Sequence, residues 1–325
     1  MKLARRRFLK FTAGTAAACV ASGLACAEAY PARPVHILVG FPPGGLTDIV
    51  ARLIGQRLSE QFGQPFVVEN RPGAVTNLAT EEVVRAQPDG YALLLATSLN
   101  AINASVYDKL GFDFARDVAP VAAIVDAGFV MEVNPSVPAQ TVADFIAYAK
   151  ANPGKLKMAS AGIGSPEHVA GAMFQMTTGV DLLHVPYRGS APYLIDLVAG
   201  QVDVVFGPIA PSVPYVNTGK LRALAVTTAT PAAALPDVPP MNRFLPGFAL
   251  SSWQGLVAPK NTPASAIDAL NAAVNAALSD PSLVARFAEL GATPIGGSSA
   301  DFAALINNDT AKWAKAVKFA NIKAE

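Results

Sequence analysis

The first part of the chain alternates short apolar runs with helical patterns. Residues 34–40 form an almost continuous apolar run, which is typical of a strand buried on both faces. Residues 47–62 carry an apolar stripe at helical spacing that stops before Gly63. Another strand, a helix and a third strand are expected at 66–68, about 78–87 and 91–97. This β-α-β-α-β order predicts a parallel sheet with right-handed crossovers.

The middle of the chain repeats this alternation. Thr141 with Asp144 forms a capping-box pattern at the start of a helix. The strands are expected at 130–133, 157–161, 182–186, 202–206 and 221–227, and the helices at 141–152, 166–178 and 191–199. After a Pro-rich stretch, a strand at 252–258 leads into three helices that begin near Thr262, Pro281 and Ser299. The pattern predicts two similar α/β halves, with a helical tail long enough to pack back on the first.

These halves define two expected lobes. We assign residues 28–125 and 250–325 to lobe 1 and residues 126–249 to lobe 2. Two lobes joined by strands enclose a cleft, and clefts between domains are common ligand sites. Closure around a ligand would use a hinge near 122–129 and 246–253.

The first 27 residues have the pattern of an export signal. Three arginines at 5–7 open a twin-arginine pattern, and an uncharged, Ala-rich stretch ends in a small-x-small site at Ala27. We expect cleavage there and a periplasmic mature protein. The stretch is too short for a membrane span, and an uncleaved anchor is the alternative. A lipoprotein attached through Cys26 is disfavoured, because Gly23 stands where a lipobox has Leu.

Cleavage changes the charge and the thiol content of the chain. The precursor has 25 Lys and Arg against 24 Asp and Glu, and the export segment holds five of the cations and none of the anions. The mature chain is therefore mildly acidic, with no basic patch for nucleic acid or anionic lipid. Cys19 and Cys26 both lie in the export segment, so the mature chain has neither a disulfide nor a thiolate metal site.

Three strand-to-helix turns carry the candidate chemistry. In the first, glycines allow a ligand close to the backbone, and the helix start offers unpaired N–H groups for an anion. Its candidate residues are Pro43, Gly44, Gly45, Leu46 and Asp48. The second turn contributes Gly162, Gly164, Ser165 and His168, and the third contributes Thr97, Ser98 and Asn100 at the end of a buried strand. Each turn also has a plainer interpretation, because Ser165 suits a helix cap and Asp48 suits a helix N-terminus without any ligand.

The chain shows recognition groups without a catalytic set. It contains no GxSxG, Walker or GxGxxG pattern and no metal motif, so we expect no cofactor and no enzymatic activity. His36 lies within a predicted strand and suits a structural role, whereas His168 and His184 follow turns of the second half. The competing hypothesis is an exported hydrolase that uses Ser165 with His168, but no third group that would orient the base is evident.

A set of short motifs in fixed order resembles the Bug family, the periplasmic substrate-binding proteins of tripartite tricarboxylate transporters. The motifs are Tyr30-Pro-Ala-Arg-Pro-Val35, Phe41-Pro-Pro-Gly-Gly45 with Asp48, Val68-Glu-Asn-Arg-Pro-Gly73, Pro88-Asp-Gly-Tyr91, Gly164-Ser165 with His168, His184-Val-Pro-Tyr-Arg-Gly189, Gly219-Lys-Leu-Arg-Ala-Leu-Ala-Val226, Leu235-Pro-Asp-Val238, Trp253 and Ala258-Pro259. Each motif is weak alone, but the ordered set is specific and covers essentially the whole mature chain.

The resemblance implies a two-lobed Venus-flytrap fold of the periplasmic-binding-protein type, type II-like. It implies capture of a small organic carboxylate between the lobes, such as a di- or tricarboxylate, an acidic amino acid or an aromatic acid, for delivery to a membrane permease. A ligand sensor that serves a sensor kinase would have the same fold, so this alternative stays open. We expect a monomer.

The resemblance also implies the site. Carried over to this chain, it comprises Pro43, Gly44, Gly45, Asp48, Thr97, Ser98, Gly164, Ser165 and Tyr187. One departure lies after Arg71-Pro72-Gly73, where the family usually continues Ala-Gly-Gly-Asn and this chain has Ala74-Val75-Thr76-Asn77. If this turn lines the cleft, the pocket is narrower and differently polar. We therefore add Thr76 and Asn77 to the candidates.

Overall fold

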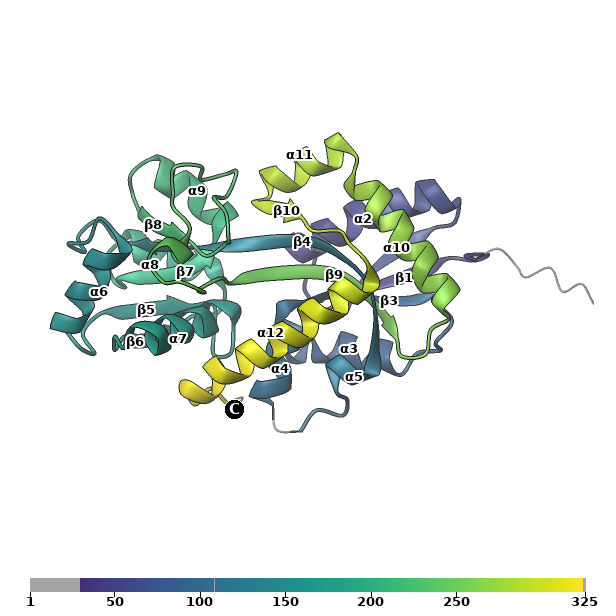
Figure 1. The fold of residues 1–325 in the computed structure, drawn as a ribbon, viewed down its shortest axis with the longest axis horizontal. Coiled ribbons are helices and arrows are strands. Elements are labelled where there is room, and N and C mark those ends of the chain that lie inside the picture. Colours follow the sequence, from purple (N-terminus) through teal and green to yellow (C-terminus); the bar gives the residue numbers. More distant parts are fainter. Residues whose placement is uncertain (1–29, 108, 324–325) are drawn as a thin grey trace, which may run out of the picture.

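The computed structural model describes residues 30–107 and 109–323. They form two α/β lobes, joined by the long strands β4 (Val118–Val133) and β9 (Ser251–Pro259) (Figure 1). One ten-stranded sheet runs through both lobes in the order β2-β1-β3-β9-β4-β7-β5-β6, and β8 and β10 also pair with β4. The two-lobed α/β fold is thus confirmed. The export segment expected at residues 1–27 lies outside the described residues.

The first lobe follows the alternating pattern. Its elements are β1 (Val35–Val39), α2 (Leu46–Phe62), β2 (Phe66–Asn70), α3 (Asn77–Val84) and β3 (Ala92–Thr97), followed by α4 (Ser98–Val106) and α5 (Phe114–Asp117). Strand β1 pairs in parallel with β2 and β3. Strand β9 returns antiparallel between β3 and β4, so segments about 150 residues apart in the sequence lie side by side.

The second lobe repeats the arrangement at the other end of the same sheet. Its elements are α6 (Val142–Ala151), β5 (Lys157–Ser160), α7 (Pro166–Thr178), β6 (Leu183–Pro186), α8 (Ser190–Val198), β7 (Val204–Pro208), α9 (Ile209–Asn217) and β8 (Arg222–Val226). Strand β5 pairs in parallel with β6 and β7. The predicted capping box of α6 is confirmed, because the Thr141 hydroxyl accepts from the Asp144 N–H and the Asp144 carboxylate accepts from the Thr141 N–H.

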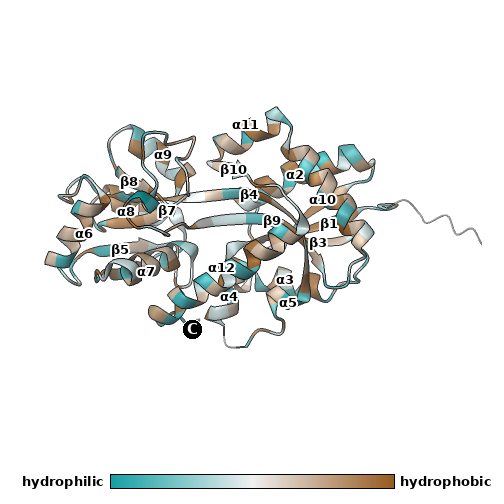
Figure 2. Ribbon diagram, in the orientation of Figure 1, coloured by the Kyte–Doolittle hydropathy of each residue, from teal (hydrophilic) through white to brown (hydrophobic). Residues whose placement is uncertain are grey.

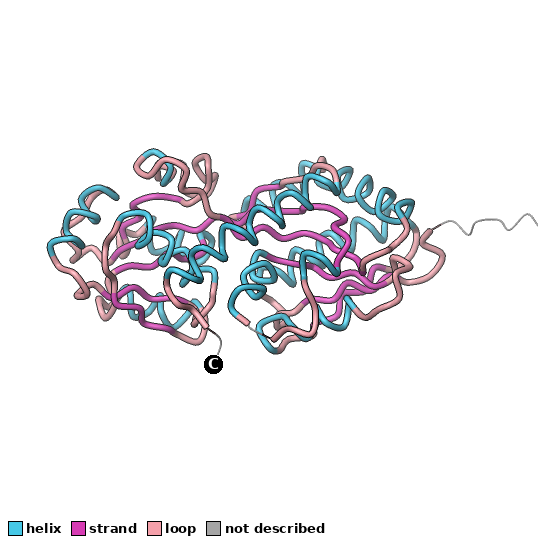
Figure 3. Tube along the Cα trace, turned by 60° about the horizontal axis from the view of Figure 1, so that its bottom comes forward, coloured by secondary structure: helices cyan, strands magenta, loops and turns pink. Residues whose placement is uncertain are grey.

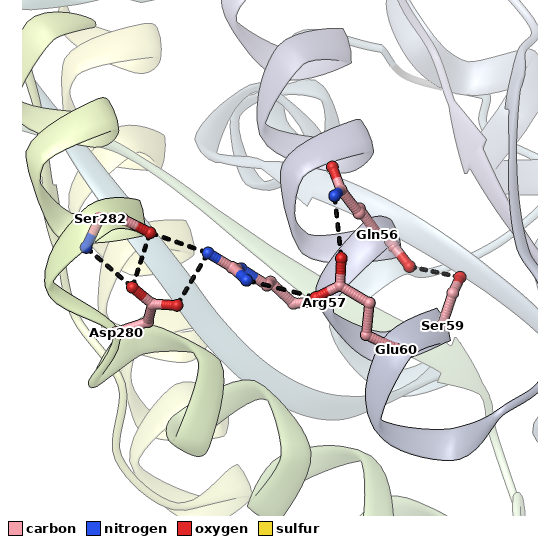
Figure 4. A network of polar contacts seen from close by, with 7 residues as sticks. Gln56, Arg57, Ser59, Glu60, Asp280 and Ser282 are labelled. Atoms are coloured by element: carbon pink, nitrogen blue, oxygen red, sulfur yellow. Dashed lines mark hydrogen bonds and ion pairs between the residues drawn. The ribbon is translucent and has the colours of Figure 1, made fainter.

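The helical tail packs on both lobes rather than on the first alone. It comprises α10 (Ala264–Leu278), α11 (Pro281–Glu289), the short strand β10 (Ala292–Pro294) and α12 (Ser299–Phe319). Arg57 of α2 ties this tail to the first lobe, because its guanidinium lies 2.7 Å from the Asp280 carboxylate and 2.8 Å from the Ser282 hydroxyl (Figure 4). Helix α12 packs on α4 and β4 and then reaches α7 of the second lobe (Figure 1).

The buried side chains form a core on each face of the sheet. On β3, Leu93 and Leu95 join the core under α2 and α10, whereas Leu94 and Ala96 join the core on the opposite face. This opposite core continues from Trp313 of α12 to Phe174 of the second lobe, so one apolar layer crosses between the lobes. Figure 2 shows the brown of apolar strands inside both lobes, with teal on outer helix faces and on β4 and β9 between the lobes. None of the described helices combines the length and the apolar character needed to cross a membrane.

Strand β4 is much longer than the predicted strand at 130–133. Its N-terminal part pairs with β9 and its last residues, from Phe129 on, pair with β7, so the strand passes from one lobe to the other (Figure 3). The buried Thr227 ties the crossing segments together, because its hydroxyl donates to the Leu250 carbonyl at 2.6 Å and accepts from the Phe129 N–H at 3.0 Å. The N-terminal half of β4 was missed because alanines, a proline and Asp126 interrupt its apolar pattern. The boundaries proposed for the lobes stay a prediction.

Two of the longer helices, α4 and α9, were not predicted, and neither was the four-residue α5. Helix α4 begins at Ser98, where the sequence analysis placed only a polar cluster at the end of a strand. Helix α9 has Pro208 as its N-cap and Pro214 inside it, and proline within a pattern normally argues against a helix. In both cases the tertiary structure places an apolar face on the core, which outweighs the local signals.

Candidate functional site

A cavity of about 460 Å³ lies between the two lobes, within the range usual for small-molecule sites. The first-lobe side and the connecting strands contribute Phe41, Leu46, Thr47, Val75, Thr97, Leu99, Ala127, Ser252 and Gln254. The second lobe contributes Phe129, Ala161, Gly162, Ile163, Ser165, Pro166, Glu167 and Pro208. We call this space the interlobe cavity. Among the described residues that line it, none is Lys, Arg or His, and Glu167 is the one acid.

The first turn presents an open helix N-terminus to this cavity. Gly45 is the N-cap of α2 and has extended backbone angles, and no side chain caps the helix. The backbone N–H groups at the start of such a helix are unpaired and carry the positive end of the helix dipole. Leu46 and Thr47, the first residues of α2, line the interlobe cavity. This turn is therefore suited to receive an anion.

Asp48 does not line the cavity, but its hydrogen bonds hold the conformation of this turn. Its carboxylate accepts from the Gly44 N–H at 2.9 Å, from the Arg52 guanidinium at 2.9 Å and from the Asn70 amide at 2.9 Å. Burial alone would raise the pKa of Asp48, but the hydrogen bonds from Arg52, Gly44 and Asn70 lower it to about 2. Asp48 is therefore ionised at neutral pH and holds the shape of the loop that precedes α2.

At the second turn, by contrast, side chains of the protein itself bind the N–H groups at the start of α7. The Ser165 hydroxyl caps α7 by accepting from the His168 N–H at 3.3 Å, and Pro166 has no N–H to offer. The Glu167 carboxylate accepts from its own backbone N–H and from the Ser165 hydroxyl. Burial nevertheless raises the pKa of Glu167, which is 5 % exposed. The second lobe thus brings an acidic cap to the cavity in place of free donors.

Two stacked histidines support the second turn. The rings of His168 and His184 lie 3.7 Å apart between centroids and are nearly parallel. His168 Nδ1 accepts from the Gly164 N–H at 3.2 Å, and His184 Nε2 lies 2.6 Å from the Ser160 hydroxyl. Burial lowers the pKa of both imidazoles to about 4, and the neighbouring His184 adds to the effect on His168. Both rings are therefore neutral at physiological pH, and His168 acts on the backbone of the turn.

The third turn caps helix α4, and one of its predicted residues lines the cavity. Thr97 and Asn100 form a capping box at the start of α4. Thr97 lines the cavity, while the Asn100 amide donates away from it to the hydroxyl of Thr80 at 2.8 Å. The Ser98 hydroxyl donates to the Ser252 hydroxyl at 3.2 Å, which leaves the Ser252 proton available for another acceptor.

The turn at Ala74–Thr76 has an unusual backbone. Its three residues have φ of 45°, 54° and 73°, in the left-handed region that glycine adopts most readily. A β-branched residue such as Val75 is strained there, at a cost of about 1–3 kcal/mol. The Asn103 amide holds the turn by donating to the Val75 carbonyl at 2.6 Å and to Asn77 at 3.0 Å. The Val75 side chain remains 46 % exposed and lines the interlobe cavity.

A second cavity of about 320 Å³ adjoins the first. It shares Val75, Gly162 and Ile163 with the interlobe cavity and contains Gly164, Tyr187 and Arg188. The Tyr187 hydroxyl donates to the Asp196 carboxylate at 2.6 Å, and burial together with this bond raises the pKa of Tyr187 to about 12. Val75 and Ile163 are therefore the two large apolar residues that line both cavities.

The predicted site residues divide into three groups. Those that line the interlobe cavity are Leu46, Thr97, Gly162 and Ser165, and those that line the adjoining cavity are Gly162, Gly164 and Tyr187. The others line neither cavity and lie in or behind the same turns: Pro43, Gly44, Gly45, Asp48, Thr76, Asn77, Ser98, Asn100 and His168. Ligand contact by any of these residues stays a prediction. No group of acids, histidines or cysteines within residues 30–107 and 109–323 is arranged to hold a metal ion.

Sequence reasoning missed the polar residues of β9. Ser252 and Gln254 line the interlobe cavity, whereas Trp253 between them is fully buried on the opposite face. Gln254 is 3 % exposed, and its Oε1 has no hydrogen-bond partner among the described residues. The alternation of polar residues with a tryptophan at the start of a predicted strand was the available signal, because alternate residues of a strand face opposite sides.

Comparison with known proteins identifies the family. A family profile described as "Tripartite tricarboxylate transporter family receptor" matches residues 50–322. The chain belongs to this family. Protein BugT of Bordetella pertussis is 34 % identical over 295 residues, which cover 90 % of this chain and 90 % of BugT. The family is one of solute-binding receptors, in agreement with the resemblance found in the sequence motifs.

Solved structures of this family have the same fold. Rpa4515 of R. palustris, solved with adipate, is 38 % identical and superimposes with a TM-score of 0.78 over 90 % of this chain and 99 % of that one. MatC of Rhodopseudomonas palustris, solved with bound malate, is 32 % identical with a TM-score of 0.74, over 89 % of this chain and 100 % of that one.

Proposed function

We propose that this receptor captures a small organic carboxylate in the interlobe cavity and delivers it to a membrane permease of the tripartite tricarboxylate transporter type. The observation that carries the proposal is the uncapped N-terminus of α2, which opens into a cavity lined by both lobes. A buried carboxylate needs such donors, because an unpaired buried charge is costly.

The side chains beside this helix start complete a donor set. Thr47 and Ser252 offer hydroxyl protons, and Gln254 offers a buried amide. The amide oxygen and nitrogen of Gln254 exchange places by rotation of the side chain, so either can face a ligand. Together these groups supply hydrogen bonds to an anion without any cationic side chain.

The relatives support the same chemistry. Rpa4515 was solved with adipate and MatC with malate, and both are small carboxylates. By extension, this chain binds a ligand of that class. Which small carboxylate it binds depends on the residues that line its own cavity. Export with cleavage near Ala27, a periplasmic location and a permease partner belong to the same proposal.

Isothermal titration calorimetry against a carboxylate panel tests the proposal. The purified protein is first unfolded and refolded to remove any ligand that copurifies, and the panel includes malate, citrate, adipate, glutamate, hexanoate and benzoate. We expect saturable binding of at least one member. Failure of the whole panel, with a correctly refolded protein, would contradict the proposal.

A matched pair of variants places the binding in the interlobe cavity. Gln254→Leu removes the buried amide and should weaken binding about 10- to 100-fold, the value of one hydrogen bond to a charged group, about 1.5–3 kcal/mol. Gln201→Leu changes an exposed glutamine of the second lobe and should leave binding unchanged. If the two variants bind the ligand with equal affinity, the ligand binds outside the interlobe cavity.

A further inference from the structure

We propose that the interlobe cavity selects a monocarboxylate with an apolar body, and that Val75 and Ile163 form the wall that excludes a second carboxylate. This inference rests on the proposed function, because it concerns the ligand of the same cavity. It follows from the distribution of donors, from the composition of the walls and from the position of Arg188 in the adjoining cavity.

The donors for an anion are confined to one side of the cavity. The open start of α2, the Ser252 hydroxyl and the Gln254 amide all lie on the first-lobe side. Across the cavity, the start of α7 is already capped by Ser165 and Glu167. One carboxylate therefore finds several donors on the first-lobe side, whereas a second carboxylate at the opposite end would meet a helix start that is already capped.

The remaining walls are apolar. Phe129, Ile163 and Pro208 of the second lobe and Phe41 and Leu99 of the first lobe surround the space beyond the donors. An apolar ligand body gains from contact with such walls, whereas a charged group there would lose its hydration without gaining partners.

A cationic side chain, Arg188, lies in the adjoining cavity beyond Val75 and Ile163. Arg188 lines the adjoining cavity but not the interlobe cavity, and Val75 and Ile163 line both. The backbone of Val75 is held on both sides, because Asn103 donates to its carbonyl and Thr76 packs on the end of β1, where a Cβ on Gly40 would lie 2.7 Å from the Thr76 Cβ. A ligand in the first cavity therefore reaches Arg188 only if the wall is shortened.

Matched ligands test the selectivity. Hexanoate and adipate differ only in the methyl or carboxylate at one end, and benzoate and terephthalate, which differ in a hydrogen or a carboxylate, form a second pair. We expect each monocarboxylate to bind at least tenfold more tightly than its dicarboxylate partner by calorimetry. Equal or tighter binding of either dicarboxylate would overturn the inference.

The outcome also separates this inference from the proposed function. If none of these four acids binds but malate, citrate or glutamate does, the selectivity is wrong and carboxylate capture stands. If no carboxylate of either set binds, both are overturned.

Shortening the wall tests the role of Val75. Val75→Gly suits the left-handed backbone and should fold normally. It should bring the affinities for hexanoate and adipate to within threefold of each other, and adding Arg188→Ala should restore the tenfold preference. Leu78→Ala, an exposed apolar residue nearby that lines neither cavity, serves as the control. If Val75→Gly keeps the tenfold preference for hexanoate over adipate, Val75 does not exclude the second carboxylate.

Discussion

The start of α2 and the start of α7 face the same cavity from opposite lobes, yet they offer it different chemistry. Both follow a glycine-containing turn at the end of a parallel strand. Gly45 at the start of α2 cannot cap its helix, so the N–H groups there stay open. Ser165 at the start of α7 caps its helix. Each helix also has an acid in its first turn, but Glu167 lines the cavity and Asp48 does not.

The difference shows that a glycine turn before a helix is not by itself an anion site. The N–H groups of a helix start bind a ligand only when no side chain of the protein already binds them. In this receptor the first lobe keeps them free, and the second lobe uses them for its own stability. The ligand carboxylate is therefore expected on the first lobe, with the second lobe closing over the rest of the ligand.

The strongest test of this contrast is to cap α2. Gly45→Asp is compatible with the backbone, because φ is −79° and an added Cβ would meet nothing within 4 Å. The new carboxylate should occupy the donors and repel the ligand, so that affinity for the carboxylate found in the panel falls about 100-fold, roughly 2.7 kcal/mol. Ser165→Asp is the matched change on α7, where a cap already exists, and should cost less than tenfold. Equal losses of affinity in the two variants would indicate that both turns bind a carboxylate of the ligand.

The next largest effect concerns the histidines beneath the second turn. The folded-state pKa of His168 and His184 is about 4, below the usual value near 6.5. Their contribution to stability is therefore complete above pH 6.5, declines as the unfolded chain takes up protons between pH 6.5 and 4, and is lost below. We expect a loss of roughly 2 kcal/mol for the pair over that window, after allowance for partial solvent exposure.

Urea unfolding at pH 7 and at pH 4 measures this loss. A His184→Gln variant, which leaves one titrating ring, should show a smaller decrease than the unaltered protein. The same decrease in both would assign the pH dependence to other groups.

A smaller effect is expected at the third turn. Thr97→Ala removes the cap of α4 and should destabilise the protein by about 1 kcal/mol. It should also weaken ligand binding a few-fold, because Thr97 lines the cavity. Ser298→Ala breaks the same kind of capping box at α12, which is remote from the cavity, and should lower stability to a similar degree without affecting binding. Thermal unfolding with and without ligand compares the two.

The smallest effect is expected where α7 loses its cap. Ser165→Gly should cost less than about 1 kcal/mol, because glycine is itself a tolerated N-cap and the Glu167 carboxyl group keeps the bond from its own backbone N–H. Ligand affinity should stay within threefold. A tenfold loss would show that the Ser165 hydroxyl contacts the ligand and that the second turn shares in anion binding.

Local sequence was a good guide to the parallel units of both lobes. The apolar run of β1, the helical stripe of α2 and the capping box of α6 depend on spacing within a few residues, and all three are confirmed. The same holds for the family, because the ordered motifs around Gly44, Ser165 and Tyr187 are read directly from the chain. These features need no knowledge of distant contacts.

The site itself was less predictable. The turns were found, but whether their helix starts are open or capped depends on the orientation of side chains such as Glu167. Ser252 and Gln254 enter the cavity because β9 inserts between β3 and β4, a pairing between segments far apart in the sequence. The departure at Val75 was visible in the sequence, but its place between two cavities was not.

The sequence by itself determined the alternating α/β elements, the family and the turns that meet at the cleft, because these depend on local spacing and on motifs in fixed order. Only the tertiary structure decided which residues of each turn line the cavity, which strand completes the donor set and how α12 joins the lobes. The physical reason is that donors, walls and cations act through distances in space, and long-range strand pairing and packing set those distances.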